Sequence, residues 1–131
     1  MAKTVAILTA RLIFGGAFLL AACFKFADMG GTAGYIAAAG FPLAPLLAWL
    51  AALFELALAA AFLTGLFFRP AALAAAAYII FLAFSFHGPD RWQANQVEFG
   101  FFVDHFTFFA GLLFAAAYGP GRWALRTPAR P

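Results

Sequence analysis

The sequence predicts an all-α membrane protein that folds as a four-transmembrane-helix bundle. Of its 131 residues, 66% are hydrophobic and only 10% are charged, and its mean hydropathy is +0.96. A soluble domain of ordinary composition is far more polar. A bilayer core is about 30 Å thick and takes roughly 20 apolar residues in a helix. Four apolar runs fit this length with short connections between them, so we expect a single transmembrane domain over residues 1–131.

The first span is expected at about residues 4–27. It carries Arg11 and Lys25, whose spacing of nearly four helical turns places them on one face. The segment Leu20-Ala21-Ala22-Cys23 resembles a lipoprotein cleavage site. Arg11 interrupts such a leader, however, and the apolar run continues beyond Cys23, so an ordinary first span is favoured. A single cysteine leaves no intramolecular disulfide, CxxC pair or cysteine zinc site, and we assign Cys23 no role.

The remaining elements follow from turn residues and apolar runs. Residues 28–41 begin with a Gly-rich stretch and are expected to be a loop with an interfacial helical turn at about 32–39. The second span is expected at about 43–66, and Pro70 suits the first position of the next helix. The third span, about 71–86, ends at His87-Gly88-Pro89, and the fourth, about 97–118, ends at Gly119-Pro120-Gly121. The basic tail after it is expected at the membrane surface.

Lys and Arg predict the orientation of the spans. The N-terminus, the turn after the second span and the tail hold most of them: Lys3, Arg11, Arg69, Arg122, Arg126 and Arg130. The other side holds Lys25 and Arg91 beside acidic residues. The positive-inside rule therefore places both termini in the cytoplasm. The net charge of +3 is spread over the ends, which indicates topology rather than nucleic-acid binding.

Glu55 lies near the middle of the second span and is the most informative residue. A carboxylate at mid-membrane is costly unless it is paired or protonated, so it must face other helices. Its helical neighbours are small: Ala48, Ala51, Ala52 and Ala59. Judged by depth, Arg11 can reach it, and an Arg11–Glu55 pair is the predicted polar core. Such a pair either serves function or only fixes which helices pack together.

A second polar group is expected near the outer surface. It consists of Lys25, His87, Glu98, Asp104 and His105, and its candidate site residues are Lys25, His87, Asp104 and His105. A Lys25–Asp104 ion pair is plausible from depth. The histidines differ in expected depth by about 12 Å, and no metal-binding spacing accompanies them. Interfacial hydrogen bonding is therefore favoured over a metal or haem site.

Phenylalanine rings surround Asp104 and His105 in the run from Phe99 to Phe109. Such rings usually face lipid or fill the core. A quinone ring, however, binds in an apolar slot with one or two polar groups, and this run permits that slot. No intrinsic cofactor is expected, and quinone is the candidate ligand.

With these features in place, the chain resembles the DoxX family of small four-helix membrane proteins. The resemblance rests on Arg11-Leu12 with Gly15, Phe18-Leu19 and Lys25, on Gly40-Phe41-Pro42, on Glu55-Leu56 with Gly65-Leu66 and Arg69, on His87, and on Gly119-Pro120-Gly121-Arg122. The chain departs from it at Asp104-His105, where many members carry Lys-Asn. The resemblance implies a multi-pass protein of the bacterial inner membrane that works with a redox system, like the small subunits of thiosulfate:quinone oxidoreductase.

The sequence therefore supports two candidate functions. The first is a quinone-interacting subunit of a membrane oxidoreductase, which needs a second subunit because the chain has no cofactor motif. The second is a non-enzymatic assembly or scaffold subunit of a larger complex, with protein partners or further copies of itself. A small transporter is less favoured, because neither an inverted repeat nor a broken helix is evident.

Overall fold

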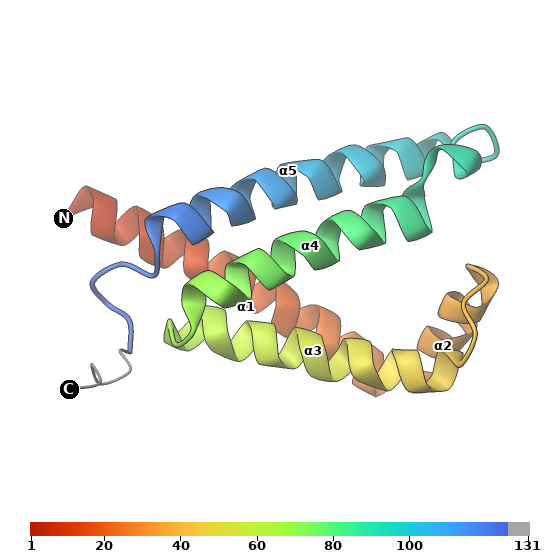
Figure 1. The fold of residues 1–131 in the computed structure, drawn as a ribbon, viewed down its shortest axis with the longest axis horizontal. Helices are drawn as coiled ribbons and strands as arrows, with labels where there is room; N and C mark the ends of the chain where they lie inside the picture. Colours follow the sequence, from red (N-terminus) through yellow and green to blue (C-terminus); the bar gives the residue numbers. More distant parts are fainter. Residues whose placement is uncertain (126–131) are drawn as a thin grey trace. The chain divides into compact units, whose positions relative to one another are not determined.

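The structure, a computed structural model, describes residues 1–125. The predicted Arg126 and Arg130 of the basic tail lie outside these residues. The element order is α1 (Ala2–Ala27), α2 (Met29–Ala38), α3 (Ala44–Thr64), α4 (Phe68–His87), the 3₁₀ helix η1 (Pro89–Arg91) and α5 (Gln96–Tyr118) (Figure 1). The described part of the chain contains four helices long and apolar enough to cross a membrane. The predicted fold class is confirmed, and each predicted span falls within a few residues of an observed helix.

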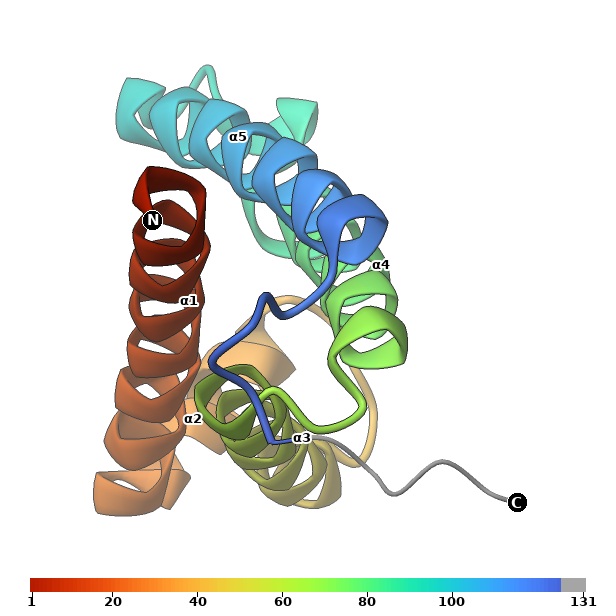
Figure 2. The ribbon, with the colours of Figure 1, turned by 90° about the vertical axis from the view of Figure 1, so that its left-hand side faces the viewer.

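The described chain divides into two compact units. The first contains residues 1–68 and 120–125, and the second contains residues 69–119. In the first unit α1 packs along α3, and the short helix α2 packs on α3 (Figure 2). In the second unit α4 and α5 lie side by side and are joined at one end by the loop that contains η1 (Figure 1).

The core of the first unit follows the helical period. The buried residues of α1 are Arg11, Gly15, Phe18 and Ala22, which share one face. They meet a stripe of α3 in which Ala48, Ala52 and Ala59 are buried beside Glu55. Small residues let helices approach closely in lipid, where there is no hydrophobic force between them. The small-residue stripe predicted around Glu55 is therefore part of the α1–α3 interface.

Phe62 is the largest side chain that is fully buried in this unit. Its ring lies 5.6 Å from that of Phe14, 5.8 Å from that of Phe18 and 5.0 Å from that of Phe68, measured between centroids. Tilted and edge-on contacts of this kind add about 0.5–1.5 kcal/mol per pair beyond the buried area. These rings hold α1 against the end of α3 where Arg11 also lies.

Helix α2 is longer than the helical turn predicted at 32–39, and it begins in the stretch expected to be a loop. Asp28 explains the difference, because its side chain accepts a hydrogen bond from the backbone N–H of Gly31 at 2.8 Å. The hydroxyl of Thr32 also donates to the carbonyl of Asp28 at 2.9 Å. An aspartate N-cap typically contributes about 1 kcal/mol, which offsets the low helix propensity of Gly30 and Gly31.

Helix α4 also begins earlier than predicted, at Phe68 rather than after Pro70. Phe67 adopts a left-handed conformation with φ of 50°, so the chain reverses in fewer residues than the sequence indicated. Pro70 then falls in the first turn of α4, where a missing N–H breaks no helical hydrogen bond.

Candidate functional site

Arg11 is buried, with 3% of its surface exposed, but it does not form the predicted core pair with Glu55. Its guanidinium donates to four backbone carbonyls. Nε and Nη2 bind Phe62 and Leu63 at 2.8 and 2.9 Å, and Nη1 binds Pro120 and Trp123, both at 2.8 Å. A planar fork with five donors suits this task, and a lysine could not reproduce it.

These contacts complete the end of α3. The last four carbonyls of a helix have no partner inside it. Here Ala61 accepts from the N–H of Gly65 at 2.8 Å and Thr64 accepts from that of Leu125 at 2.8 Å. Arg11 occupies the two carbonyls between them. A cation at a helix C-terminus also complements the macrodipole, so a buried arginine is stable here without a carboxylate.

Glu55 instead forms an ion pair with Lys25, at 2.9 Å between Oε2 and Nζ. The side chain of Glu55 is 4% exposed and that of Lys25 is 25% exposed. Lys25 therefore pairs with Glu55 inside the first unit. The predicted Arg11–Glu55 pairing was wrong because of the register of α1 against α3.

Gly15 fixes that register. A Cβ at Gly15 would lie only 2.8 Å from the side chain of Leu63, so the two backbones are level at this point. From there Lys25 lies 10 residues along α1 and Glu55 lies 8 residues back along α3, about 15 and 12 Å. A lysine stem spans the remaining distance easily. Arg11, four residues on the other side of Gly15, lies at the end of α3.

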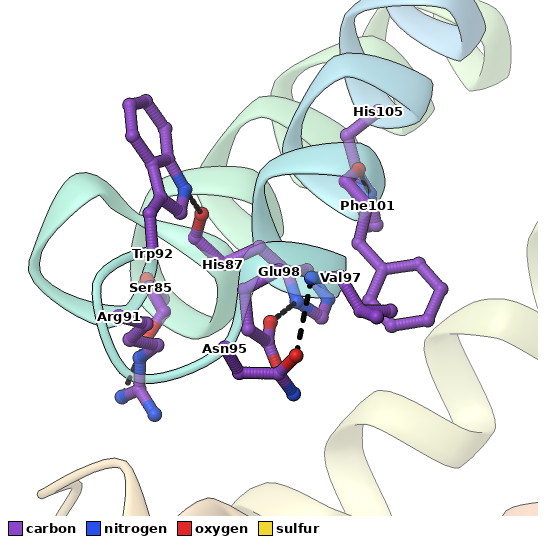
Figure 3. A network of polar contacts seen from close by, with 9 residues as sticks. All are labelled: Ser85, His87, Arg91, Trp92, Asn95, Val97, Glu98, Phe101 and His105. Atoms are coloured by element: carbon purple, nitrogen blue, oxygen red, sulfur yellow. Dashed lines mark hydrogen bonds and ion pairs between the residues drawn. The ribbon is translucent and has the colours of Figure 1, made fainter.

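The second polar cluster lies where α4 and α5 are joined, and it belongs to the second unit (Figure 3). Nδ1 of His87 forms a close hydrogen-bonded ion pair with Oε2 of Glu98. The carbonyl of His87 accepts a hydrogen bond from Nε1 of Trp92 at 2.8 Å. Asn95 caps the start of α5, where its side chain accepts from the N–H of Val97 at 3.1 Å. The loop thus fixes the position of Glu98 against the last residue of α4.

His105 completes this cluster from the third turn of α5. Its ring centroid lies 5.0 Å from that of His87, although the sequence predicted depths about 12 Å apart. The loop carries the chain beyond His87 before α5 begins, so His87 lies level with the second turn of α5. The His105 side chain points back along the helix, and its Nδ1 bonds the carbonyl of Phe101 at 2.7 Å.

The predicted site residues are thus divided between two places. His87 and His105 come together, and Glu98, which was absent from the candidate list, joins them. The spacing of Glu98, Phe101 and His105 by three and then four residues is the signal for a shared face. Asp104 is exposed on another face of α5, and Cys23 is also exposed. Among residues 1–125, no three His, Cys, Asp or Glu side chains gather as metal ligands.

One phenylalanine ring contacts each of the two histidine rings. The ring of Phe101 lies 5.2 Å from that of His87, and the ring of Phe108 lies 5.9 Å from that of His105. Trp92 belongs to a separate group of rings, in which it packs edge-on against Phe99 and Phe102 at 4.9 and 5.1 Å. This combination of flat apolar walls and a few polar atoms is typical of sites for small planar molecules. We call His87, Glu98 and His105, together with the rings of Phe101 and Phe108, the histidine site.

Comparison with known proteins identifies the family of the chain. No curated protein and no solved structure matches the chain. The DoxX family model matches residues 6–88, a segment that includes Arg11, Lys25, Glu55 and His87. Glu98 and His105 lie beyond it, so the α5 half of the histidine site is read from this chain alone. With more than half of its length matched and four apolar helices that can span a bilayer, the chain belongs to the DoxX family of membrane proteins.

Proposed function

We propose that the protein is a quinone-interacting subunit of a membrane redox system and that the histidine site receives the quinone headgroup. The observation that carries this proposal is the pair of imidazole rings 5.0 Å apart, one of them bonded to a carboxylate. A bound quinone supplies two-electron chemistry that takes up or releases two protons. The electrons need a second subunit, because the chain has no redox motif of its own.

The two histidines offer complementary nitrogens to such a headgroup. Nδ1 of His105 faces a carbonyl and must carry a proton, so in the neutral ring Nε2 is an acceptor. Nδ1 of His87 faces Glu98. Among residues 1–125, neither Nε2 has a hydrogen-bond partner. Both nitrogens are therefore available to the oxygen atoms of a ligand that enters between the aromatic rings.

Glu98 gives His87 a route for its proton. The carboxylate lies on Nδ1 while Nε2 faces the ligand position, so a proton taken up at Nε2 is balanced by one passed to Glu98 from Nδ1. The side chain of Glu98 is 23% exposed and that of His87 is 15% exposed. Glu98 lies in the first turn of α5, at the end of the span, where water is close. His87 and Glu98 thus support proton exchange between a membrane ligand and the surface.

The test is quinone binding to the pure protein in nanodiscs. Short-chain benzoquinone and naphthoquinone analogues are titrated, and difference spectra give the dissociation constant. We expect His87→Phe and His105→Phe to weaken binding at least tenfold, the equivalent of about 1.4 kcal/mol. Glu98→Gln should retain most of the affinity but slow proton uptake on reduction of the bound quinone.

Asp104→Asn is the matched control, because Asp104 is adjacent to His105 in sequence but lies outside the histidine site. Its affinity should stay close to that of the unchanged protein, because the coulombic influence of Asp104 is the smallest of those acting on the His105 ring. A protein that gives no difference spectrum with either analogue, or histidine variants that bind as well as Asp104→Asn, would contradict the proposed function.

A scaffold function is the second candidate, and the Lys25–Glu55 pair favours it, because a buried ion pair specifies which helices pack together. Under that function Glu55→Gln lowers the yield of the assembled complex while each surviving complex keeps its turnover. Under the quinone function the histidine variants lower the turnover at an unchanged yield.

A further inference from the structure

One face of α5 is marked by small and polar residues. Gly100, Asp104, Thr107 and Gly111 follow one another by four, three and four residues, so they lie on one side of the helix. Gly100, Asp104 and Thr107 are exposed and Gly111 is half-buried. A Cβ at Gly100 would meet no atom within 4 Å. We call these four residues the Asp104 face.

The position of Asp104 along the span makes its exposure costly. It follows Gln96 by eight residues and precedes Tyr118 by fourteen, about 12 and 21 Å from the two ends of α5. An aspartate at the centre of a membrane helix costs about 2.5–3.5 kcal/mol. Within the described residues of the second unit, Asp104 has no hydrogen bond or ion pair. A carboxylate at this depth calls for a cation against it.

The basic side chains within the spans are already engaged. Arg11 holds the carbonyls at the end of α3, and Lys25 is paired with Glu55. Arg69 donates through Nη1 to the carbonyls of Ala116 and Ala117 at 3.0 Å each. A second copy of the chain brings the same engaged cations and a second Asp104, so self-association across this face would place like charges together.

We propose that the Asp104 face binds a transmembrane helix of a different protein and that this helix carries a Lys or Arg within its apolar span. The basic residue lies level with Asp104, about eight residues from the end of the partner helix nearest the α4–α5 loop. Gly100 and Gly111 let the two backbones approach closely, as small residues do between membrane helices. The ion pair then sets partner choice and depth together.

This surface is separate from the histidine site. Glu98, Phe101 and His105 share a face that lies roughly 120° around α5 from the Asp104 face, at about 100° per residue. A partner helix on the Asp104 face therefore leaves the histidine site open. The proposal goes beyond quinone binding and stands if quinone binding fails.

The test is site-specific photocrosslinking of the full-length protein in its native membranes. A benzophenone amino acid replaces Gly100 in one variant and Gly16 in the control. A Cβ at Gly16, exposed on α1, also meets no atom within 4 Å, so both glycines accept the large side chain equally. We expect a discrete adduct from Gly100 but not from Gly16. Peptide mapping of the partner should locate the crosslink in a transmembrane helix that contains Lys or Arg at the matching depth.

Charge variants then test the ion pair. Asp104→Asn should lower the adduct yield about tenfold, Asp104→Glu should retain it, and Asp90→Asn, a neutralisation in the exposed loop, should have no effect. The adduct yield of the Asp104→Lys variant should recover when the partner's basic residue is changed to Glu. The proposal is overturned by adducts only with lipid or with a second copy, by a partner span without Lys or Arg, or by an adduct yield that Asp104→Asn leaves unchanged.

Discussion

The Lys25–Glu55 pair makes the sharpest quantitative prediction. With Nζ and Oε2 at 2.9 Å, the Coulomb attraction is about 6 kcal/mol at an effective dielectric constant of about 20. Desolvation offsets much of this, and removal of one partner from a buried pair typically costs about 3–5 kcal/mol. Because a quarter of the Lys25 side chain is exposed, we expect Lys25→Met and Glu55→Met each to cost about 2–3 kcal/mol.

The double variant should cost less than the two single variants together. Replacing both charges with apolar side chains removes the desolvation penalty along with the attraction. We therefore expect the combined change to cost about 2 kcal/mol, which gives a coupling energy of about 3 kcal/mol, at the top of the range for contacting residues. Reversible unfolding in mixed micelles, with SDS as the denaturant, measures all four free energies of unfolding.

A second cycle, Arg11→Met with Glu55→Met, is the matched control within the same unit. It tests the other pairing that depth suggested for Glu55, and its coupling energy should stay below about 0.5 kcal/mol, because Arg11 is bonded to the carbonyls at the end of α3. A strong coupling of Glu55 to Arg11, together with a weak coupling to Lys25, would refute the register that Gly15 sets between α1 and α3.

Three further predictions use the same unfolding assay. Arg11→Lys keeps the charge but has only three N–H donors for the four carbonyls, so it should cost about 1–3 kcal/mol. A loss below about 0.5 kcal/mol would show that charge alone suffices. Gly15→Ala should cost about 1–3 kcal/mol, because its Cβ would meet Leu63 at 2.8 Å, while Gly16→Ala, which meets open space, should be neutral or stabilising. Asn95→Ala removes the N-cap of α5 and should cost about 1 kcal/mol, and an unchanged stability would mean that the loop positions Glu98 without this cap.

The spans were predictable because they depend on composition. A run of about 20 apolar residues bounded by Gly, Pro or charge has few other structures available to it. The starts of α2 and α4 were less predictable, because each depends on one local contact or backbone angle. Asp28 turned an expected loop into a helix, and the left-handed Phe67 shortened the turn before α4.

The partners of the charges could not be read from depth. Depth was counted from the ends of the spans, and this treats each helix as if it were level with the next. The close approach of Gly15 to Leu63 shifts α1 along α3, which exchanges the partner of Glu55. Counting depth from the helix ends also failed to predict that His87 and His105 lie together. The length of the α4–α5 loop decides which turn of α5 lies beside His87. In both cases the missing information is the axial position of one helix relative to its neighbour, which the sequence of a single helix does not specify.

The two units satisfy the carbonyls at the end of their last helix in the same way. Each has an arginine on its first long helix that binds carbonyls at the C-terminal end of its last one, Arg11 on α3 and Arg69 on α5. A glycine with positive φ follows each end, Gly65 and Gly119. Carbonyls at membrane depth cannot rely on water and must find donors within the protein. This explains why an arginine stands inside the apolar run of α1 without a carboxylate, and it leaves Lys25 as the cation that Glu55 requires.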